Sequence, residues 1–305
     1  MAVNIAAGPS SSHIRDNAPV DADSPASRTA LGAARHRAVH QLLEGGSILH
    51  DPLAVRATGD DPDDLVARAT ERGDHRMRWF VCARSRFAEE VLADAVAAGV
   101  DQLVVLGAGL DTFAYRNPYA DLRVVEVDHP ATGAWKLERL AAAGIGVPDG
   151  VTHAVVDFER QDPLDVLAAS LALDRPVLFW WLGVTPYLTG PAIEATLRRL
   201  GSLPSSAVVL DHAVPLTDIA DTDTAETAAL TRRRREAVAR LGEPWVSAYA
   251  YPELAELVRR SGFTGVRPED EGAMIRRCLG LTPPDSRSRP RPSHLVLATR
   301  GWPTA

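Results

Sequence analysis

The feature that most constrains the fold is an apolar run that leads directly into a glycine turn, Leu103–Arg116 (LVVLGAGLDTFAYR). Its first four residues are apolar and partly β-branched, which is typical of a strand buried on both faces of a parallel sheet. Gly107, Ala108 and Gly109 then let the backbone turn sharply, because glycine has no Cβ to clash. A ligand can therefore approach the main chain closely at this turn, and all three residues are candidate cofactor contacts.

A second apolar run, Leu122–Val127, carries the acid that such a pocket needs. Glu126 and Asp128 lie seventeen and nineteen residues after Gly109. A nucleotide-binding βαβ unit places a carboxylate at about this distance to accept hydrogen bonds from ribose hydroxyls. We expect Asp128 to contact the ribose, because it lies nearer the turn, and Glu126 to act on the other hydroxyl or on the local backbone.

The residues after the glycine pair indicate the cofactor. A dinucleotide fingerprint has a third glycine or alanine where this chain has Thr112. Asp111 precedes it, and a carboxylate beside a helix N-terminus would repel a pyrophosphate but could pair with an ammonium or sulfonium group. The turn favours S-adenosylmethionine over NAD, while a tight structural turn remains the alternative.

The chain alternates strand-like and helix-like segments. Strands are expected at 103–106, 122–127, 151–156, 177–181, 207–210, around 263–266 and at 293–299, and helices at about 27–43, 76–98 and 252–261. This order predicts an α/β fold with a doubly wound, Rossmann-like sheet of mostly parallel strands. Residues 1–26 lack periodicity and are expected to form a disordered tail before a single domain, 27–305. The proline-rich segment 283–292 is expected to be an exposed loop.

Composition narrows the function classes. A net charge of −7 and a pI near 5.7 argue against nucleic-acid binding, and the basic run Arg232–Arg235 is interpreted as a solvated helix face. Cys82 and Cys278 cannot form a disulfide framework, and neither has metal-ligand spacing around it. With no membrane-length apolar run and no secretion signal, we expect a cytoplasmic protein that binds neither metal nor membrane.

Several ordered blocks resemble one known family. They are SRTALGAARHRA, DPLA, CARSRF, LGAGLDTFAYR, VVEVDHPATGAWK, VVDFE and LGVTPYLT, and they cover nearly the whole chain from about Ser27. The chain is similar to class I S-adenosylmethionine-dependent methyltransferases of the leucine carboxyl methyltransferase type, including bacterial natural-product enzymes. The resemblance implies the cofactor and an N-terminal helical lid.

The resemblance also implies individual cofactor contacts. Arg84 lies in the block where the family clamps the cofactor's carboxylate with an arginine, a task that suits a planar guanidinium. Asp157 and Phe158 match the acid and apolar neighbour that hold the adenine. Arg37 is a second arginine that could assist, with a surface arginine as the alternative.

One position departs from the family pattern. The family often has a glutamate where this chain has Leu182, before Gly183. If that glutamate contacts the cofactor's amino group, a backbone carbonyl such as that of Gly107, or another acid, must replace it. Leu182 follows Trp180 and Trp181, so this wall of the pocket is expected to be apolar and to suit an aromatic or otherwise hydrophobic acceptor.

Methyl transfer to a carboxylate needs alignment more than acid–base chemistry, whereas a phenol or alcohol acceptor needs a base. His212, just after a predicted strand, is the candidate base, with a structural histidine as the alternative. Tyr187 and Tyr249 are candidate acceptor-orienting groups. Three further histidines lie on the N-terminal helices and could face an acceptor: His36, His40 and His75.

We therefore expect an S-adenosylmethionine-dependent methyltransferase that O-methylates a carboxylate or hydroxyl of a small secondary metabolite. The alternatives are C- or N-methylation of an aromatic ring, a non-catalytic homologue that retains the fold, and an NAD-dependent oxidoreductase. The sequence does not fix the oligomeric state.

Overall fold

The computed structural model describes residues 26–73, 75–218, 225–281 and 294–303. The expected tail, apart from Ala26, and the expected loop at 283–292 lie outside the described residues. Helix α1 begins at Arg28, where Ser27 caps it by accepting a hydrogen bond from the main-chain nitrogen of Ala30 at 3.1 Å. Gly45 ends α1 in the left-handed conformation.

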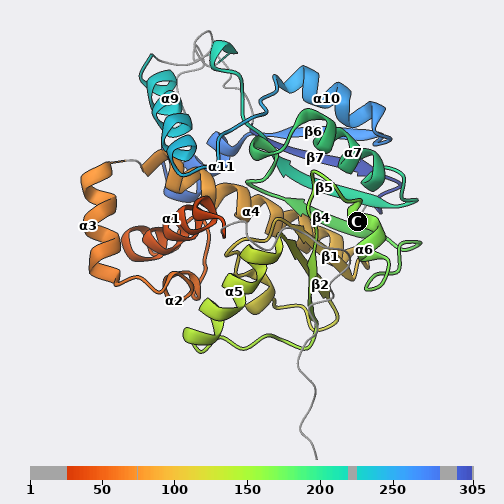
Figure 1. Cartoon of the computed structure of the whole chain (residues 1–305), viewed down its shortest axis with the longest axis horizontal. Coiled ribbons are helices and arrows are strands. Elements are labelled where there is room, and N and C mark those ends of the chain that lie inside the picture. The colour runs from red at the N-terminus through yellow and green to blue at the C-terminus, as the bar shows by residue number, and fades with distance from the viewer. Residues whose placement is uncertain (1–25, 74, 219–224, 282–293, 304–305) are drawn as a thin grey trace, which may run out of the picture.

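The described strands form one seven-stranded sheet in the order β3-β2-β1-β4-β5-β7-β6 (Figure 1). Their bounds are β1 Gln102–Leu106, β2 Arg123–Asp128, β3 Val151–Val155, β4 Val177–Trp181, β5 Ser206–Asp211, β6 Gly265–Glu269 and β7 Leu295–Arg300. Strands β1 to β5 are parallel, and β7 is antiparallel to both β5 and β6. The prediction of a mostly parallel, Rossmann-like sheet is confirmed.

Strand β4 has the predicted limits, whereas the limits of the other strands differ from the prediction by one to three residues. Strand β2 includes Asp128, because that residue pairs with Val155 of β3. Strand β6 begins only at Gly265, because its pairing with β7 starts there, opposite Thr299.

The helices in the described residues are α1 Arg28–Glu44, α2 Ala54–Thr58, α3 Pro62–Arg72, α4 His75–Ala97, α5 Pro130–Ala142, α6 Pro163–Leu167, α7 Gly190–Leu200, α9 Ala225–Arg240, α10 Tyr251–Arg260 and α11 Glu271–Leu279, with single 3₁₀ turns at η1 Phe113–Tyr115 and η2 Thr185–Tyr187. In this described part of the chain, each helix is too short or too polar to cross a membrane.

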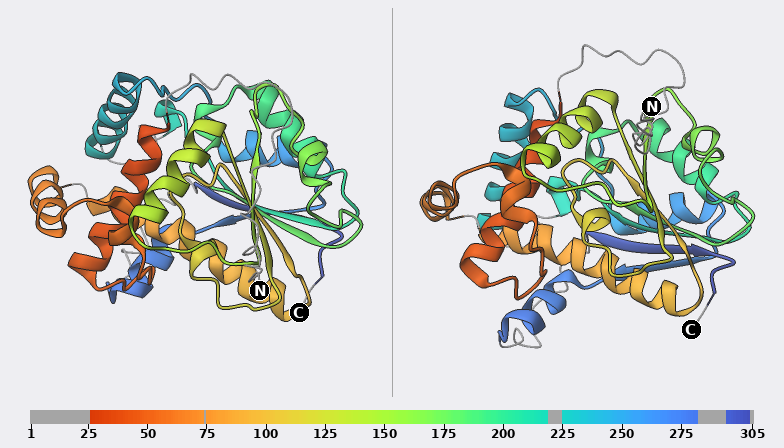
Figure 2. Two further views of the ribbon diagram at one scale, coloured as in Figure 1. Left: turned by 60° about the horizontal axis from the view of Figure 1, so that its bottom comes forward. Right: turned by 90° about the horizontal axis from the view of Figure 1, so that it is seen from below.

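Alternating strand residues build two cores, one on each face of the sheet. On β1, Val104 and Leu106 pack with α6, α7 and α10, whereas Leu103 and Val105 pack with α4 and α11. Helix α5 contacts β2 and β3. Helices α1, α2 and α3 lie together beyond one end of the sheet, where α1 packs on α4 (Figure 2). The N-terminal region is therefore helical, as expected.

Candidate functional site

The glycine turn follows β1 in the conformation that its sequence predicts. Gly107 and Gly109 have φ angles of +68° and +47°, a region that other residues rarely adopt. Val127 accepts hydrogen bonds from the main-chain nitrogens of Gly107 and Ala108 at 2.7 and 3.0 Å. The turn is thus tied to the end of β2.

Asp128 closes this turn. Its Oδ2 accepts a hydrogen bond from the Gly109 nitrogen at 2.5 Å, and its Oδ1 accepts one from the His129 nitrogen at 2.7 Å. Burial raises the pKa of Asp128, and these two N–H groups oppose the rise. Each carboxylate oxygen has a second lone pair that a ribose hydroxyl could use, so the ribose contact stays a prediction.

A cavity of about 280 Å³ lies beside Asp128, between α5 and the ends of β2 and β3. Its lining residues are Ala108, Glu126, Asp128, Pro130, Gly133, Ala134, Lys136, Leu137, His153, Ala154 and Val155. Three of the sequence-predicted cofactor residues, Ala108, Glu126 and Asp128, therefore share one cavity.

Glu126 belongs to a buried polar cluster. Its Oε1 accepts a hydrogen bond from Lys136 Nζ at 2.7 Å, and its Oε2 accepts one from the Tyr115 hydroxyl at 2.9 Å. His153 Nε2 lies 2.8 Å from the same hydroxyl. Burial, together with the charge of Glu126, raises the pKa of Tyr115. Both oxygens of Glu126 thus hold neighbouring elements together, and its role toward a ribose stays a prediction.

Asp111 faces cations of the protein itself. Its Oδ1 accepts a hydrogen bond from the Phe113 nitrogen at 2.8 Å. Burial alone would raise its pKa, but the positive charges of Arg37, Lys136 and Arg116 hold the pKa below its ordinary value. The structure therefore supplies this carboxylate with positive charge before any ligand binds.

Arg37 supports the main chain just after the glycine turn. It is 5% exposed, its Nη2 donates to the Leu110 carbonyl at 2.6 Å, and its Nε lies 3.4 Å from Asp51 Oδ2. The alternative of a surface arginine was wrong. Asp51, which sequence reasoning noted only inside the DPLA block, is fully buried and also accepts a hydrogen bond from Thr112 Oγ1 at 2.6 Å.

The first turn of α1 covers this edge of the sheet. Glu243 accepts hydrogen bonds from the hydroxyls of Ser27 and Thr29, at 2.9 and 2.5 Å, and from the Arg28 nitrogen at 2.6 Å. The Ser27 nitrogen donates to Thr132 Oγ1, at the start of α5, at 3.1 Å. No sequence signal pointed to Glu243, because it anchors a helix more than 200 residues away.

Asp157 and Phe158 follow the end of β3 after one intervening residue, Val156. Asp157 Oδ1 accepts a hydrogen bond from the Glu159 nitrogen at 2.9 Å, and Phe158 packs on the core with its ring centroid 6.2 Å from that of Trp181. Both residues are half-buried at the carboxyl end of a strand. Their contact with adenine stays a prediction.

The two tryptophans of β4 point into opposite cores rather than forming one wall. Trp181 is fully buried on the α7 face, and Trp180 stacks edge-to-face on Phe113 at 4.8 Å on the other face. This follows from the two-residue period of a strand. Trp180 and Trp181 are both buried, whereas Leu182, the third residue of the expected wall, is partly exposed.

Arg84 lies at the carboxyl edge between β4 and β5. Its Nη1 donates to Asp211 Oδ2 at 2.7 Å, and Asp211 Oδ1 accepts a hydrogen bond from the Gly183 nitrogen at 2.5 Å. Sequence reasoning missed Asp211, which was expected just beyond a strand that ended at residue 210. The rule that residues at the carboxyl ends of strands line the site could have identified it.

His212 and Tyr187 lie at the same edge. His212 is buried, and its Nδ1 lies 3.3 Å from the Ala213 carbonyl oxygen. Burial raises the pKa of Tyr187, while nearby Trp245, Thr29 and Arg84 oppose that rise. These contacts do not test a catalytic role, so both catalytic assignments stay predictions. The main-chain nitrogen of Tyr249 donates to the Ala213 carbonyl at 2.9 Å, which brings that segment beside His212.

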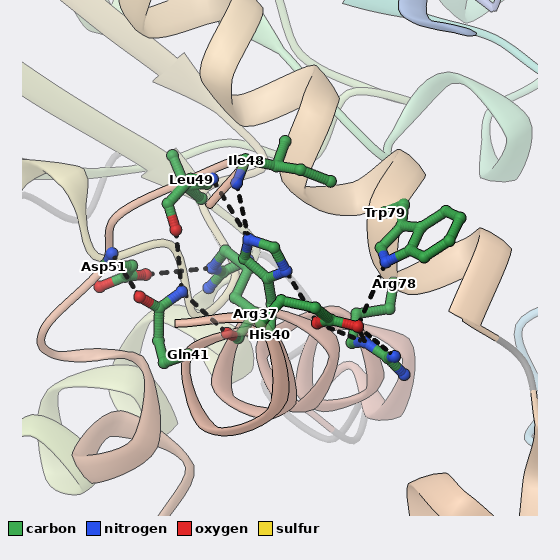
Figure 3. A network of polar contacts seen from close by, with 9 residues as sticks. Arg37, His40, Gln41, Ile48, Leu49, Asp51, Arg78 and Trp79 are labelled. Atoms are coloured by element: carbon green, nitrogen blue, oxygen red, sulfur yellow. Dashed lines mark hydrogen bonds and ion pairs between the residues drawn. The ribbon is translucent and has the colours of Figure 1, made fainter. Parts of the chain in front are cut away.

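One of the three N-terminal histidines proves to be structural. His40 is fully buried, with Nδ1 2.9 Å from Glu44 Oε2 and with Nε2 accepting a hydrogen bond from the Ile48 nitrogen at 3.0 Å (Figure 3). Glu44 in turn binds the guanidinium of Arg78 and the indole N–H of Trp79. Both ring nitrogens of His40 are engaged, so the expectation that it could face an acceptor was wrong.

A model of the leucine carboxyl methyltransferase family matches residues 30–201. The chain is also 33% identical over 199 residues to YktD of Bacillus subtilis (strain 168), whose name describes a candidate S-adenosyl-L-methionine-dependent methyltransferase. That alignment covers 62% of this chain and 63% of YktD. A Rhodococcus jostii (strain RHA1) protein with the same description is 33% identical over 198 residues, which are 63% of this chain and 67% of that protein.

The matched region thus spans less than two thirds of the length of YktD. Among solved structures, a DUF574 family protein from Streptomyces avermitilis superposes with a TM-score of 0.52 at 18% identity, covering 87% of this chain and 96% of that one. At this identity the likeness concerns the fold.

Proposed function

The chain belongs to the leucine carboxyl methyltransferase family, and from that membership we propose that it transfers the methyl group of S-adenosylmethionine to a small-molecule acceptor. The observation that carries the cofactor assignment is the glycine turn closed by Asp128 beside a cavity of about 280 Å³. Backbone at this turn can approach a ligand closely, and a carboxylate stands at the ribose position.

The acceptor that we propose is a carboxylate or hydroxyl group of a secondary metabolite. When bound, S-adenosylmethionine would supply an electrophilic methyl group to the acceptor oxygen, with neutral S-adenosylhomocysteine as the leaving group. A carboxylate needs no base for this step, since it attacks as an anion. A hydroxyl acceptor must lose a proton, and His212 is the group that we assign to receive it.

The chain's own residues would serve mainly to align the reactants. Arg84 would bind the cofactor's carboxylate, Asp128 the ribose, and Asp157 with Phe158 the adenine. His212 and Tyr187 would act on the acceptor. Alignment of this kind supplies much of the rate of a displacement reaction. We also propose a cytoplasmic location, because both cysteines are free thiols.

Calorimetry tests the cofactor, and mass spectrometry tests the acceptor. We expect the protein to bind S-adenosylmethionine and S-adenosylhomocysteine, and to ignore NAD and NADH. Reactions with isotope-labelled methyl donor and pooled host metabolites should yield a labelled ester or ether. Binding of NADH without S-adenosylmethionine would overturn the proposal, and cofactor binding with label on carbon or nitrogen would replace O-methylation.

A further inference from the structure

Arg84 and Asp211 form a buried ion pair between α4 and the end of β5. Their side chains are 11% and 5% exposed, and Arg84 Nη1 lies 2.7 Å from Asp211 Oδ2. The other carboxylate oxygen accepts a hydrogen bond from the Gly183 nitrogen at 2.5 Å, and the main-chain carbonyl of Asp211 accepts one from the Thr185 hydroxyl at 2.7 Å. Asp211 therefore ties the guanidinium to the turn that follows β4.

The guanidinium of Arg84 packs directly against the main chain of Gly183. A Cβ at Gly183 would lie 2.8 and 2.9 Å from Nη2 and Nη1 of Arg84, and the φ angle of Gly183 is +75°. The Phe80 ring lies 5.9 Å from the guanidinium carbon, within the range of a cation–π contact. The orientation of Arg84 is thus set by three neighbours, only one of which is charged.

This orientation places Arg84 beside the proposed cofactor site. Val184, the next residue after Gly183, contacts the space where a Cβ of Gly107 would lie, so the β4 turn packs on the glycine turn. Within the described residues, the buried Nε of Arg84 has no hydrogen-bond partner. A guanidinium has five N–H donors, so one engaged at Asp211 leaves donors for a second carboxylate.

We propose that Asp211 is a positioning residue that fixes Arg84 for the α-amino-acid end of the cofactor. The inference rests on the proposed function. Because the Asp211 side chain is only 5% exposed and is bonded directly to the guanidinium, Asp211 acts through the arginine. The negative charge of Asp211 also makes the Arg84–Asp211 pair neutral overall. A neutral pair suits the α-amino-acid end of the cofactor, which carries a positive ammonium and a negative carboxylate on neighbouring atoms.

The test compares two ligands that share a nucleoside. S-adenosylhomocysteine carries the amino-acid end, and 5′-methylthioadenosine lacks it. Asp211→Asn retains the shape of the side chain but removes its charge. We expect its Kd for S-adenosylhomocysteine to rise about 10- to 100-fold, the effect of losing a charge-assisted hydrogen bond, while its Kd for methylthioadenosine stays within about twofold of wild type.

Glu44→Gln is the matched control. It also removes a half-buried carboxylate that binds an α4 arginine, Arg78, but it lies in the N-terminal network. The ratio of the two Kd values should therefore stay at its wild-type value. Gly183→Ala displaces the guanidinium but keeps the Asp211 carboxylate and its charge, so it should shift the ratio as Asp211→Asn does and serves if that variant fails to fold.

Equal weakening of both ligands in Asp211→Asn would mean a merely structural role and would overturn the inference, as would an unchanged Kd for S-adenosylhomocysteine. If the wild-type protein binds neither ligand, the proposed function itself fails. The two failures are therefore distinguishable.

Discussion

Ala30 packs directly on Gly109: a Cβ at Gly109 would lie 3.0 Å from the Cβ of Ala30. The first turn of α1 therefore covers the glycine turn, and Glu243 and Thr132 hold it there. A side chain at position 109 would therefore displace the N-terminal helix from the glycine turn.

Gly109→Ala should weaken both cofactor binding and the fold. The left-handed backbone alone costs an alanine about 1–2 kcal/mol, and the clash with Ala30 adds to it. Gly73→Ala is the control, since Gly73 has a φ of +64° with nothing within 4 Å of its added Cβ. Urea denaturation and calorimetry should give the larger loss of stability, and the only loss of affinity, at position 109. Equal losses at both positions would contradict the close packing.

Glu126→Ala should destabilise the protein strongly, because it leaves Lys136 buried and unpaired. Both side chains are 2% exposed, and removing one partner of a buried ion pair typically costs about 3–5 kcal/mol. The double variant Glu126→Gln with Lys136→Met should recover much of that loss in a denaturation series. A Glu126→Ala protein as stable as wild type, yet unable to bind cofactor, would instead identify a ribose ligand.

The strands could be predicted from the sequence because a strand buried on both faces must be an unbroken apolar run. Strand β4 was located to the residue, since all five of its residues are buried. The glycine turn could be predicted equally well, because its two positive φ angles, at Gly107 and Gly109, favour glycine. Local chemistry determines both features.

Partnerships between distant residues could not be predicted. Arg84 was singled out by a motif, but its partner Asp211 lies 127 residues later. Glu44 lies within reach of His40 on the same helix, but nothing in that helix reveals that the main-chain amide of Ile48 engages the other ring nitrogen. Such pairings depend on how helices dock, which the sequence pattern of one helix does not specify.

The Glu44 network should make the N-terminal helices sensitive to acid. Burial would raise the pKa of Glu44, but hydrogen bonds from His40 and Arg78 hold it at about 2, below its ordinary value of 4.5. A depressed carboxyl pKa stabilises the fold fully above about pH 4.5, and this contribution disappears as the pH falls toward 2. Glu44→Gln should therefore lose stability at pH 7 and little at pH 2.5. A loss that is the same at both pH values in guanidinium titrations would contradict this account.

Glu271 should have the opposite pH dependence. Burial raises its pKa to about 7, and the nearby acids Asp270 and Glu269 add to the rise, while N–H groups of His294 and of Glu271 itself oppose it. A carboxyl whose pKa is raised from 4.5 by folding binds its proton more tightly in the folded state, so the free energy of unfolding falls as the pH rises from about 4.5 through 7. Glu271→Gln carries no ionisable group at this position. We expect it to match wild type near pH 4.5 and to exceed wild-type stability at pH 8 by on the order of 2–3 kcal/mol.

Glu236→Gln, on the exposed face of α9, is the control and should change stability little at either pH. His294, whose pKa burial lowers to about 4, titrates in wild type and variant alike, so the difference between the two stability curves isolates Glu271. A Glu271→Gln curve parallel to the wild-type curve from pH 4.5 to 8 would show that the carboxyl is not buried as the structure has it.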